Sequence, residues 1–153
     1  MNNTSDLPEE ESSALEMLLA DEYVLYMRTR DGSRNIPDTS SAEAQDLLQR
    51  QCASMGWIVA GVSKMVRKFG PPPSFVSEKF IAIARLSRHS GQFTSQNEIV
   101  KVLLNDHESM IRVLRNHESP LMRRRSIINT AEFMTGLLKQ HEELAGALKE
   151  WLE

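Results

Sequence analysis

The chain of 153 residues has one cysteine, Cys52, and a net charge of only −3. A single cysteine excludes an internal disulfide and any zinc motif built from cysteines alone, which fits a reducing, cytoplasmic environment. The charge lacks the basic surplus that is typical of nucleic-acid binding proteins. No apolar run approaches the ~20 residues that a membrane-spanning helix needs, so no membrane partner is expected.

The remaining composition is that of an ordinary globular protein, with 41% hydrophobic and 25% charged residues. A chain of this length suits one domain with a core that needs no covalent cross-links. The polar, acidic segment 1–16 lacks the pattern of a secretory leader. We therefore expect a short acidic tail over residues 1–7 and one domain over residues 8–153.

Apolar residues recur at helical spacing in four long segments. Ser40 or Ser41 can start the second helix, and Ser95-Gln96-Asn97-Glu98 has the form of a capping box for the third. No segment reads as a strand, so the pattern predicts an all-α bundle. The expected helices cover about residues 8–29, 41–69, 96–116 and 129–151, with a short helical insert over 74–86. The first should end near Thr29, before a turn-rich stretch over residues 31–38 that contains Gly32.

Several segments, in order and with matching spacing, resemble one known family. They include Leu18-Leu19-Ala20-Asp21-Glu22-Tyr23, Val66-Arg67-Lys68-Phe69-Gly70, Asp106-His107-Glu108 and Gln140-His141-Glu142-Glu143-Leu144-Ala145. The family is Dps, the DNA-protecting mini-ferritins of starved bacteria, and the resemblance covers about residues 15–153. It implies a ferritin-like four-helix bundle with a short extra helix between the second and third helices. It also implies self-assembly into a hollow dodecamer, and iron as a cofactor.

The family oxidises ferrous iron at a site shared across a two-fold interface, with ligands from the first two helices. The resemblance places those ligand roles on Ser33, Gln45, Ala60 and Lys64. None of these is a strong iron ligand, because iron favours carboxylates and imidazoles. Between Asp46 and Glu78 the sequence has no Asp, Glu or His at all. We therefore expect a degenerate ferroxidase centre and no catalytic residue.

Two other groups of residues offer substitute iron ligands. Asp106, His107, His141 and Glu142 can form a metal site inside one subunit, and Asp38, Glu43 and Asp46 offer carboxylates elsewhere. The structural interpretation of the first group, a buried hydrogen-bonded cluster that fixes packing, is the one we favour. Cys52 lies on an apolar stripe, which favours inert packing over redox chemistry.

A basic run, Arg123-Arg124-Arg125, can contact DNA phosphates. Three adjacent arginines are more often a solvated turn. The first twenty residues hold five acids and no base, unlike the lysine-rich tails of many Dps proteins, which argues against DNA as a partner.

The sequence thus predicts a Dps-like shell protein that acts in stress protection or as a structural component. It assembles with itself or with an active Dps relative. The alternatives are iron oxidation at a non-standard site and DNA binding.

Overall fold

The structure is a computed structural model that describes residues 9–68, 93–116 and 130–153. These residues form four helices, α1 (Glu9–Arg34), α2 (Ala42–Lys68), α4 (Gln96–Arg115) and α6 (Thr130–Leu152), and no strand. The predicted all-α, ferritin-like class is confirmed. The expected acidic tail over residues 1–7 and the expected short helix over 74–86 lie outside the described residues.

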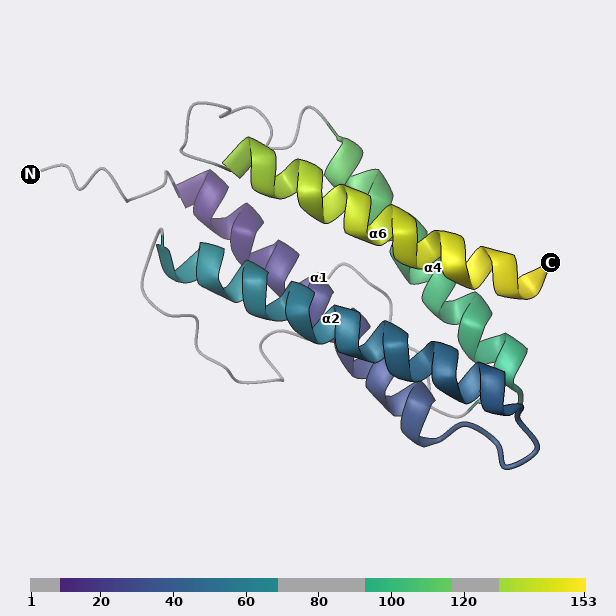
Figure 1. Cartoon of the computed structure of the whole chain (residues 1–153). Coiled ribbons are helices and arrows are strands. Elements are labelled where there is room, and N and C mark those ends of the chain that lie inside the picture. Colours follow the sequence, from purple (N-terminus) through teal and green to yellow (C-terminus); the bar gives the residue numbers. More distant parts are fainter. Residues whose placement is uncertain (1–8, 69–92, 117–129) are drawn as a thin grey trace, which may run out of the picture.

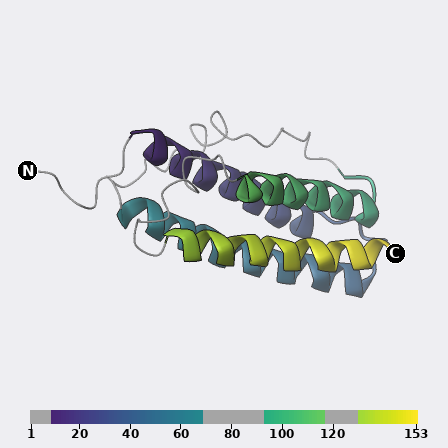
Figure 2. The same ribbon diagram turned by 90° about the horizontal axis from the view of Figure 1, so that it is seen from above.

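The helices form two antiparallel pairs, α1 with α2 and α4 with α6 (Figure 1). Seen from above, α1 and α4 lie in one layer, and α2 and α6 lie in the other (Figure 2). α2 ends at the end of the bundle opposite to the one where α4 begins. This arrangement is that of ferritin-like bundles with one long crossover.

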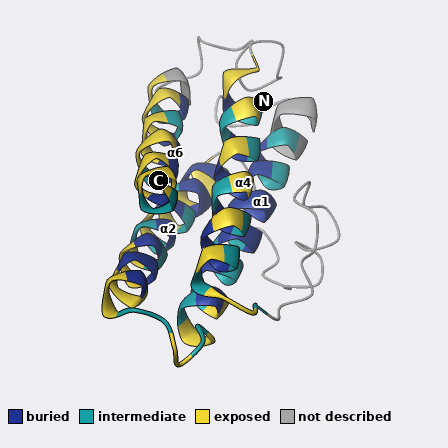
Figure 3. Ribbon diagram, turned by 90° about the vertical axis from the view of Figure 1, so that its right-hand side faces the viewer, coloured by how far each residue is buried: buried dark blue, intermediate teal, exposed yellow. Residues whose placement is uncertain are grey.

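The core lies between the two layers. Each helix turns its buried residues inward and its exposed residues outward (Figure 3), as apolar residues spaced three and four apart require. The largest completely buried apolar side chains include Leu25, Leu48, Met55, Leu103, Met110 and Leu148. In the described parts of the chain, no helix combines the length and apolar character needed to cross a membrane.

The first helix is longer than the sequence pattern predicted. Its expected end near Thr29 is wrong, because α1 continues to Arg34. The backbone N–H and the side-chain Nδ2 of Asn35 both donate to the carbonyl oxygen of Asp31, at 2.9 Å each. Gly32, which suggested a turn, is buried against α4, where an added Cβ would lie 2.8 Å from Cγ2 of Ile99. The glycine marks a close helix contact.

Side-chain caps fix the starts of two helices, as predicted. The N–H of Ala44 donates to Oγ of Ser41 at 3.1 Å, and the N–H of Glu98 donates to Oγ of Ser95 at 3.1 Å. The carboxylate of Glu98 accepts from the N–H of Thr94 at 2.8 Å, one residue before the position that a capping box uses. The N–H of Ser41 also donates to Oε1 of Gln96 at 2.9 Å, which joins the starts of α2 and α4.

Candidate functional site

The positions assigned to the family's iron ligands lie on the outer side of the bundle. Ser33 is half-buried near the end of α1, and Gln45, Ala60 and Lys64 are exposed on α2. The buried face of α2 contributes no titratable side chain. Within the described residues, no group of three or more His, Cys, Asp and Glu side chains is arranged to hold a metal ion.

The outer face of α2 carries a large apolar side chain instead. Trp57 is 79% exposed, with the exposed Ala53 and Ala60 about one turn away on either side. The neighbouring glycines face other helices, since a Cβ on Gly56 would lie 3.7 Å from the Tyr26 ring of α1. A Cβ on Gly61 would likewise lie 3.8 Å from the Phe133 ring of α6. The small residues therefore border close helix contacts, while the indole of Trp57 lies outside the core.

Inside the bundle, three polar side chains from three helices meet. Oε1 and Oε2 of Glu22 lie 2.8 and 3.0 Å from Nε2 of His141. Nδ1 of His141 lies 2.9 Å from Nδ1 of His107. All three side chains are completely buried. We call Glu22, His141 and His107 the core triad. It joins α1 to α6 and α6 to α4.

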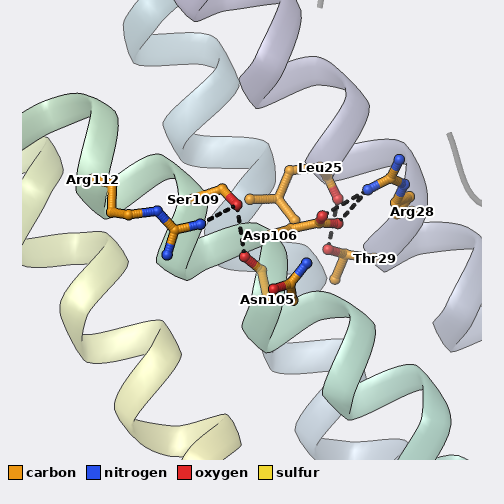
Figure 4. A network of polar contacts seen from close by, with 7 residues as sticks. All are labelled: Leu25, Arg28, Thr29, Asn105, Asp106, Ser109 and Arg112. Carbon is orange, nitrogen blue, oxygen red and sulfur yellow. Dashed lines mark hydrogen bonds and ion pairs between the residues drawn. The ribbon is translucent and has the colours of Figure 1, made fainter. Parts of the chain in front are cut away.

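The other two members of the expected metal cluster are paired elsewhere. Both carboxylate oxygens of Asp106 accept from Nη1 of Arg28, at 2.7 and 2.6 Å, in a pair that joins α4 to α1 (Figure 4). Glu142 is exposed and accepts from Nη2 of Arg115 at 3.2 Å. Of the predicted cluster, the structure therefore brings only the two histidines into contact with each other.

Further hydrogen bonds lie on either side of the Arg28–Asp106 pair (Figure 4). The hydroxyl of Thr29 donates to the carbonyl oxygen of Leu25 at 2.7 Å. On the other side, Oγ of Ser109 donates to the carbonyl oxygen of Asn105 at 3.0 Å. The first bond satisfies the buried hydroxyl of Thr29, because buried polar groups need partners, whereas the bond of Ser109 lies at the exposed side.

The surroundings of His107 disfavour its charged form. Burial, with the charge of His141 as a smaller cause, lowers the pKa of His107 to about 3. Burial also raises the pKa of the Cys52 thiol, although Arg30 and Arg34 oppose that change. A thiol with a raised pKa is a poor nucleophile, which agrees with the packing role expected for Cys52.

Glu22 and Arg28 are two partners in these buried contacts that the sequence interpretation missed. Glu22 was recognised in the sequence only as part of the segment from Leu18 to Tyr23 that resembles the Dps family. Its spacing held the signal, because it follows Leu18 by four residues and Leu19 by three and so lies on the apolar stripe of α1. An acid on such a stripe requires a buried partner, and His141 supplies it.

The remaining candidate residues are exposed or lie outside the described ranges. The carboxylates of Asp38, Glu43 and Asp46 are exposed, and that of Asp46 pairs with Arg50 on the same helix at 2.7 Å. Arg123, Arg124 and Arg125 lie outside the described residues, as do His89 and His117.

Comparison with curated proteins gives a clear relative. An uncharacterised low temperature-induced protein of a Nostoc species is 30% identical over 135 residues, which cover 88% of this chain and 75% of that protein. The chain belongs to the family of this low temperature-induced protein. The homologue in Anabaena variabilis matches this family member equally well, at 30% identity over 135 residues. No protein-family model matches the chain.

Solved structures share the fold of this low temperature-induced family member. An archaeal Dps homologue from Halobacterium salinarum has a TM-score of 0.82 at 19% identity and covers 93% of this chain and 78% of its own. Dps from Thermosynechococcus elongatus has a TM-score of 0.78 at 18% identity, with 93% and 89% covered. A dodecameric thioferritin, the bacterioferritin-related protein from Bacteroides fragilis, has a TM-score of 0.76 at 13% identity, with 92% and 83% covered. The predicted Dps fold is confirmed.

Proposed function

We propose that this chain is the subunit of a homo-oligomeric, Dps-like shell whose inter-subunit ferroxidase centre is vacant. Its role is stress protection or structure, without iron oxidation. The observation that carries the proposal is the outer face of α2, where Gln45, Ala60 and Lys64 occupy the positions that the family resemblance assigns to ligands. An amide, a methyl group and an ammonium do not replace imidazole and carboxylates, and the ammonium of Lys64 repels a cation.

The exposed indole supports self-assembly. Contiguous exposed apolar patches mark interaction sites, and tryptophan is among the residue types enriched at the positions that contribute most to binding. Trp57, with the exposed Ala53 and Ala60 about one turn away, offers such an apolar patch on α2. A two-fold interface uses the same patch on both subunits, so one indole per chain is enough to build it. The dodecameric state of the B. fragilis thioferritin, which shares the fold, supports the same proposal.

The relatives support the stress role. The Nostoc protein is named for its induction at low temperature. A shell protein made at low temperature protects by enclosing or organising material, and this role needs no catalysed reaction. Cytoplasmic localisation remains our expectation.

The vacancy is tested with iron. Purified protein is titrated anaerobically with Fe(II) and then given peroxide, while ferric absorbance is compared with a protein-free control. We expect no saturable binding and no oxidation faster than the control. Saturable binding with faster oxidation would overturn the proposal, and His141→Asn would then show whether the core imidazoles are responsible.

A restored variant supplies the positive control. Ser33→His, Gln45→His, Ala60→Asp and Lys64→Glu together return the family's ligand types to the positions that the resemblance assigns. We expect this variant to gain saturable Fe(II) binding in the assembled protein. If the wild-type protein and the variant bind Fe(II) equally, the iron site lies elsewhere in the molecule.

A further inference from the structure

The core triad is a chain of hydrogen bonds whose protons can be counted. An ionised Glu22 only accepts, so Nε2 of His141 must carry a proton toward it. When both rings are neutral, Nδ1 of His141 is then a bare acceptor. Nδ1 of His107, 2.9 Å away, must donate to it. One proton therefore lies between the two rings, and Nε2 of His107 is left without one.

The triad can take up one further proton without losing a contact. With His141 fully protonated, its Nδ1–H donates to Nδ1 of His107, and the proton of His107 moves to its own Nε2. That Nε2 atom is buried and has no hydrogen-bond partner within the described structure. The positive charge on His141 is balanced by the carboxylate of Glu22, 2.8 Å from Nε2.

A second added proton breaks the contact between the rings. Both Nδ1 atoms would then carry hydrogens that face each other across 2.9 Å, and two cations would lie side by side in the core. Two N–H groups that face each other cannot form a hydrogen bond, and burial of an unpaired charge is costly. The low pKa of His107, about 3, reflects this second step, since burial and the charge of His141 both oppose it.

The other charged groups near the triad matter, because they could balance a second added proton. On α1, Asp21 is also completely buried, and Arg28 is held by Asp106 of α4. α6 contributes His141 itself as its buried titratable side chain in the described part of the chain. α2 contributes only Gln51 and Ser63 as buried polar residues, neither of which titrates. Among the described contacts, Glu22 is the carboxylate within hydrogen-bond distance of the rings, through Nε2 of His141.

We propose that the core triad is an acid-sensitive contact that holds α1, α4 and α6 together while the imidazoles share a proton and that yields when both are protonated. The free energy of unfolding then falls as the pH drops below about 6.5, although the contact itself yields only near pH 3. Unfolded His107 titrates near its ordinary value of about 6.5, and folded His107 far lower, so the unfolded state binds more protons between these limits. Stability from this residue is complete above about pH 6.5 and is lost as pH falls toward 3.

The test is the pH dependence of unfolding by urea, measured from pH 7.5 to pH 5.0 at fixed subunit concentration. His107→Asn keeps a donor for Nδ1 of His141 but cannot titrate. We expect the unfolding constant of wild type to rise about thirtyfold more than that of this variant over the range, because one proton contributes up to tenfold per pH unit below 6.5. Equal rises in the two proteins would overturn the proposal.

His107→Asn should make the fall of stability with pH shallower, and a second variant, Glu22→Gln, should make it steeper. Glu22→Gln keeps an acceptor for Nε2 of His141 but removes the negative charge that balances an added proton in the core, so stability falls more steeply as the pH falls. Glu142→Gln, an exposed acid beside His141, is the matched control and should keep the wild-type slope. If His107→Asn fails to fold at pH 7.5, equal slopes for wild type and Glu22→Gln overturn the proposal.

Discussion

Gly32 shows at the residue scale how closely two helices approach. An added Cβ would lie 2.8 Å from Cγ2 of Ile99, a completely buried side chain, so one of the two helices or the side chain must shift. We expect Gly32→Ala to destabilise the protein by about 1–3 kcal/mol, as overpacking of a core does. Urea unfolding measures the change.

Gly146 on α6 is exposed with no atom near its Cβ position, so Gly146→Ala should stabilise by about 0.5–1 kcal/mol through helix propensity. Equal effects of both changes would contradict the close contact.

The Arg28–Asp106 pair gives a second prediction at this scale. The two side chains are 11% and 5% exposed, so removing one partner leaves the other charge buried. We expect Asp106→Asn to cost about 3 kcal/mol, and Arg28→Met with Asp106→Asn to cost less than the two single changes added. A double-mutant cycle in urea measures the coupling.

An exposed ion pair is the control for this cycle. Arg115 and Glu142 are 59% and 45% exposed, and Arg115→Met should change stability by no more than about 0.5 kcal/mol. If the buried and the exposed pair showed the same coupling energy, burial would not be the reason for the difference.

The sequence revealed part of the polar core. His107 and His141 stood out because histidines are few and both lie on inner stripes, and their contact is confirmed. Their partner Glu22 was missed because an acid among many acids is conspicuous only by its register on the helix. Asp106 was placed in the wrong group, since nothing local in the sequence shows that Arg28, 78 residues earlier, reaches it.

At the element scale, the start of α2 allows a test with two adjacent serines. The hydroxyl of Ser41 accepts from the N–H of Ala44, whereas the hydroxyl of Ser40 is buried without a partner in the described structure. We expect Ser41→Ala to cost about 1 kcal/mol, as loss of an N-cap does. Ser40→Ala should be neutral or stabilising, because it removes an unsatisfied polar group. Urea unfolding of both variants measures this, and the reverse order would contradict the cap.

Helix positions were more predictable than one helix end. Apolar spacing placed all four long helices, because a bundle buries one stripe of each. Gly32 misled the prediction for α1, because a glycine needed for a turn and one needed for close packing look alike in a sequence. The difference depends on Ile99 of α4, which lies 67 residues away in the sequence and only in the folded chain comes close.

For the whole molecule, the proposed assembly depends on the face of α2 around Trp57. We expect Trp57→Glu to shift the protein to smaller species in sedimentation velocity while circular dichroism keeps its helix content. A charge placed in an apolar interface opposes association, and an exposed position leaves the subunit fold intact. Lys101→Glu, on the exposed side of α4, is the control and should keep the wild-type size. Unchanged assembly in the Trp57 variant would contradict this interface.

Besides the bond between Ser41 and Gln96 at the helix starts, three polar contacts of the described residues connect the α1–α2 pair to the α4–α6 pair. Glu22 binds His141, Arg28 binds Asp106, and Nε2 of Gln51 donates to the carbonyl oxygen of Leu144 at 3.1 Å. During folding, each helix pair can form from contacts near in sequence, but these three links close only when the pairs meet. A slip of one helical turn, about 5.4 Å, would bury Glu22 and Arg28 without partners. The charged core groups therefore favour one alignment of the two helix pairs, because every alignment shifted by a helical turn leaves buried charges without partners.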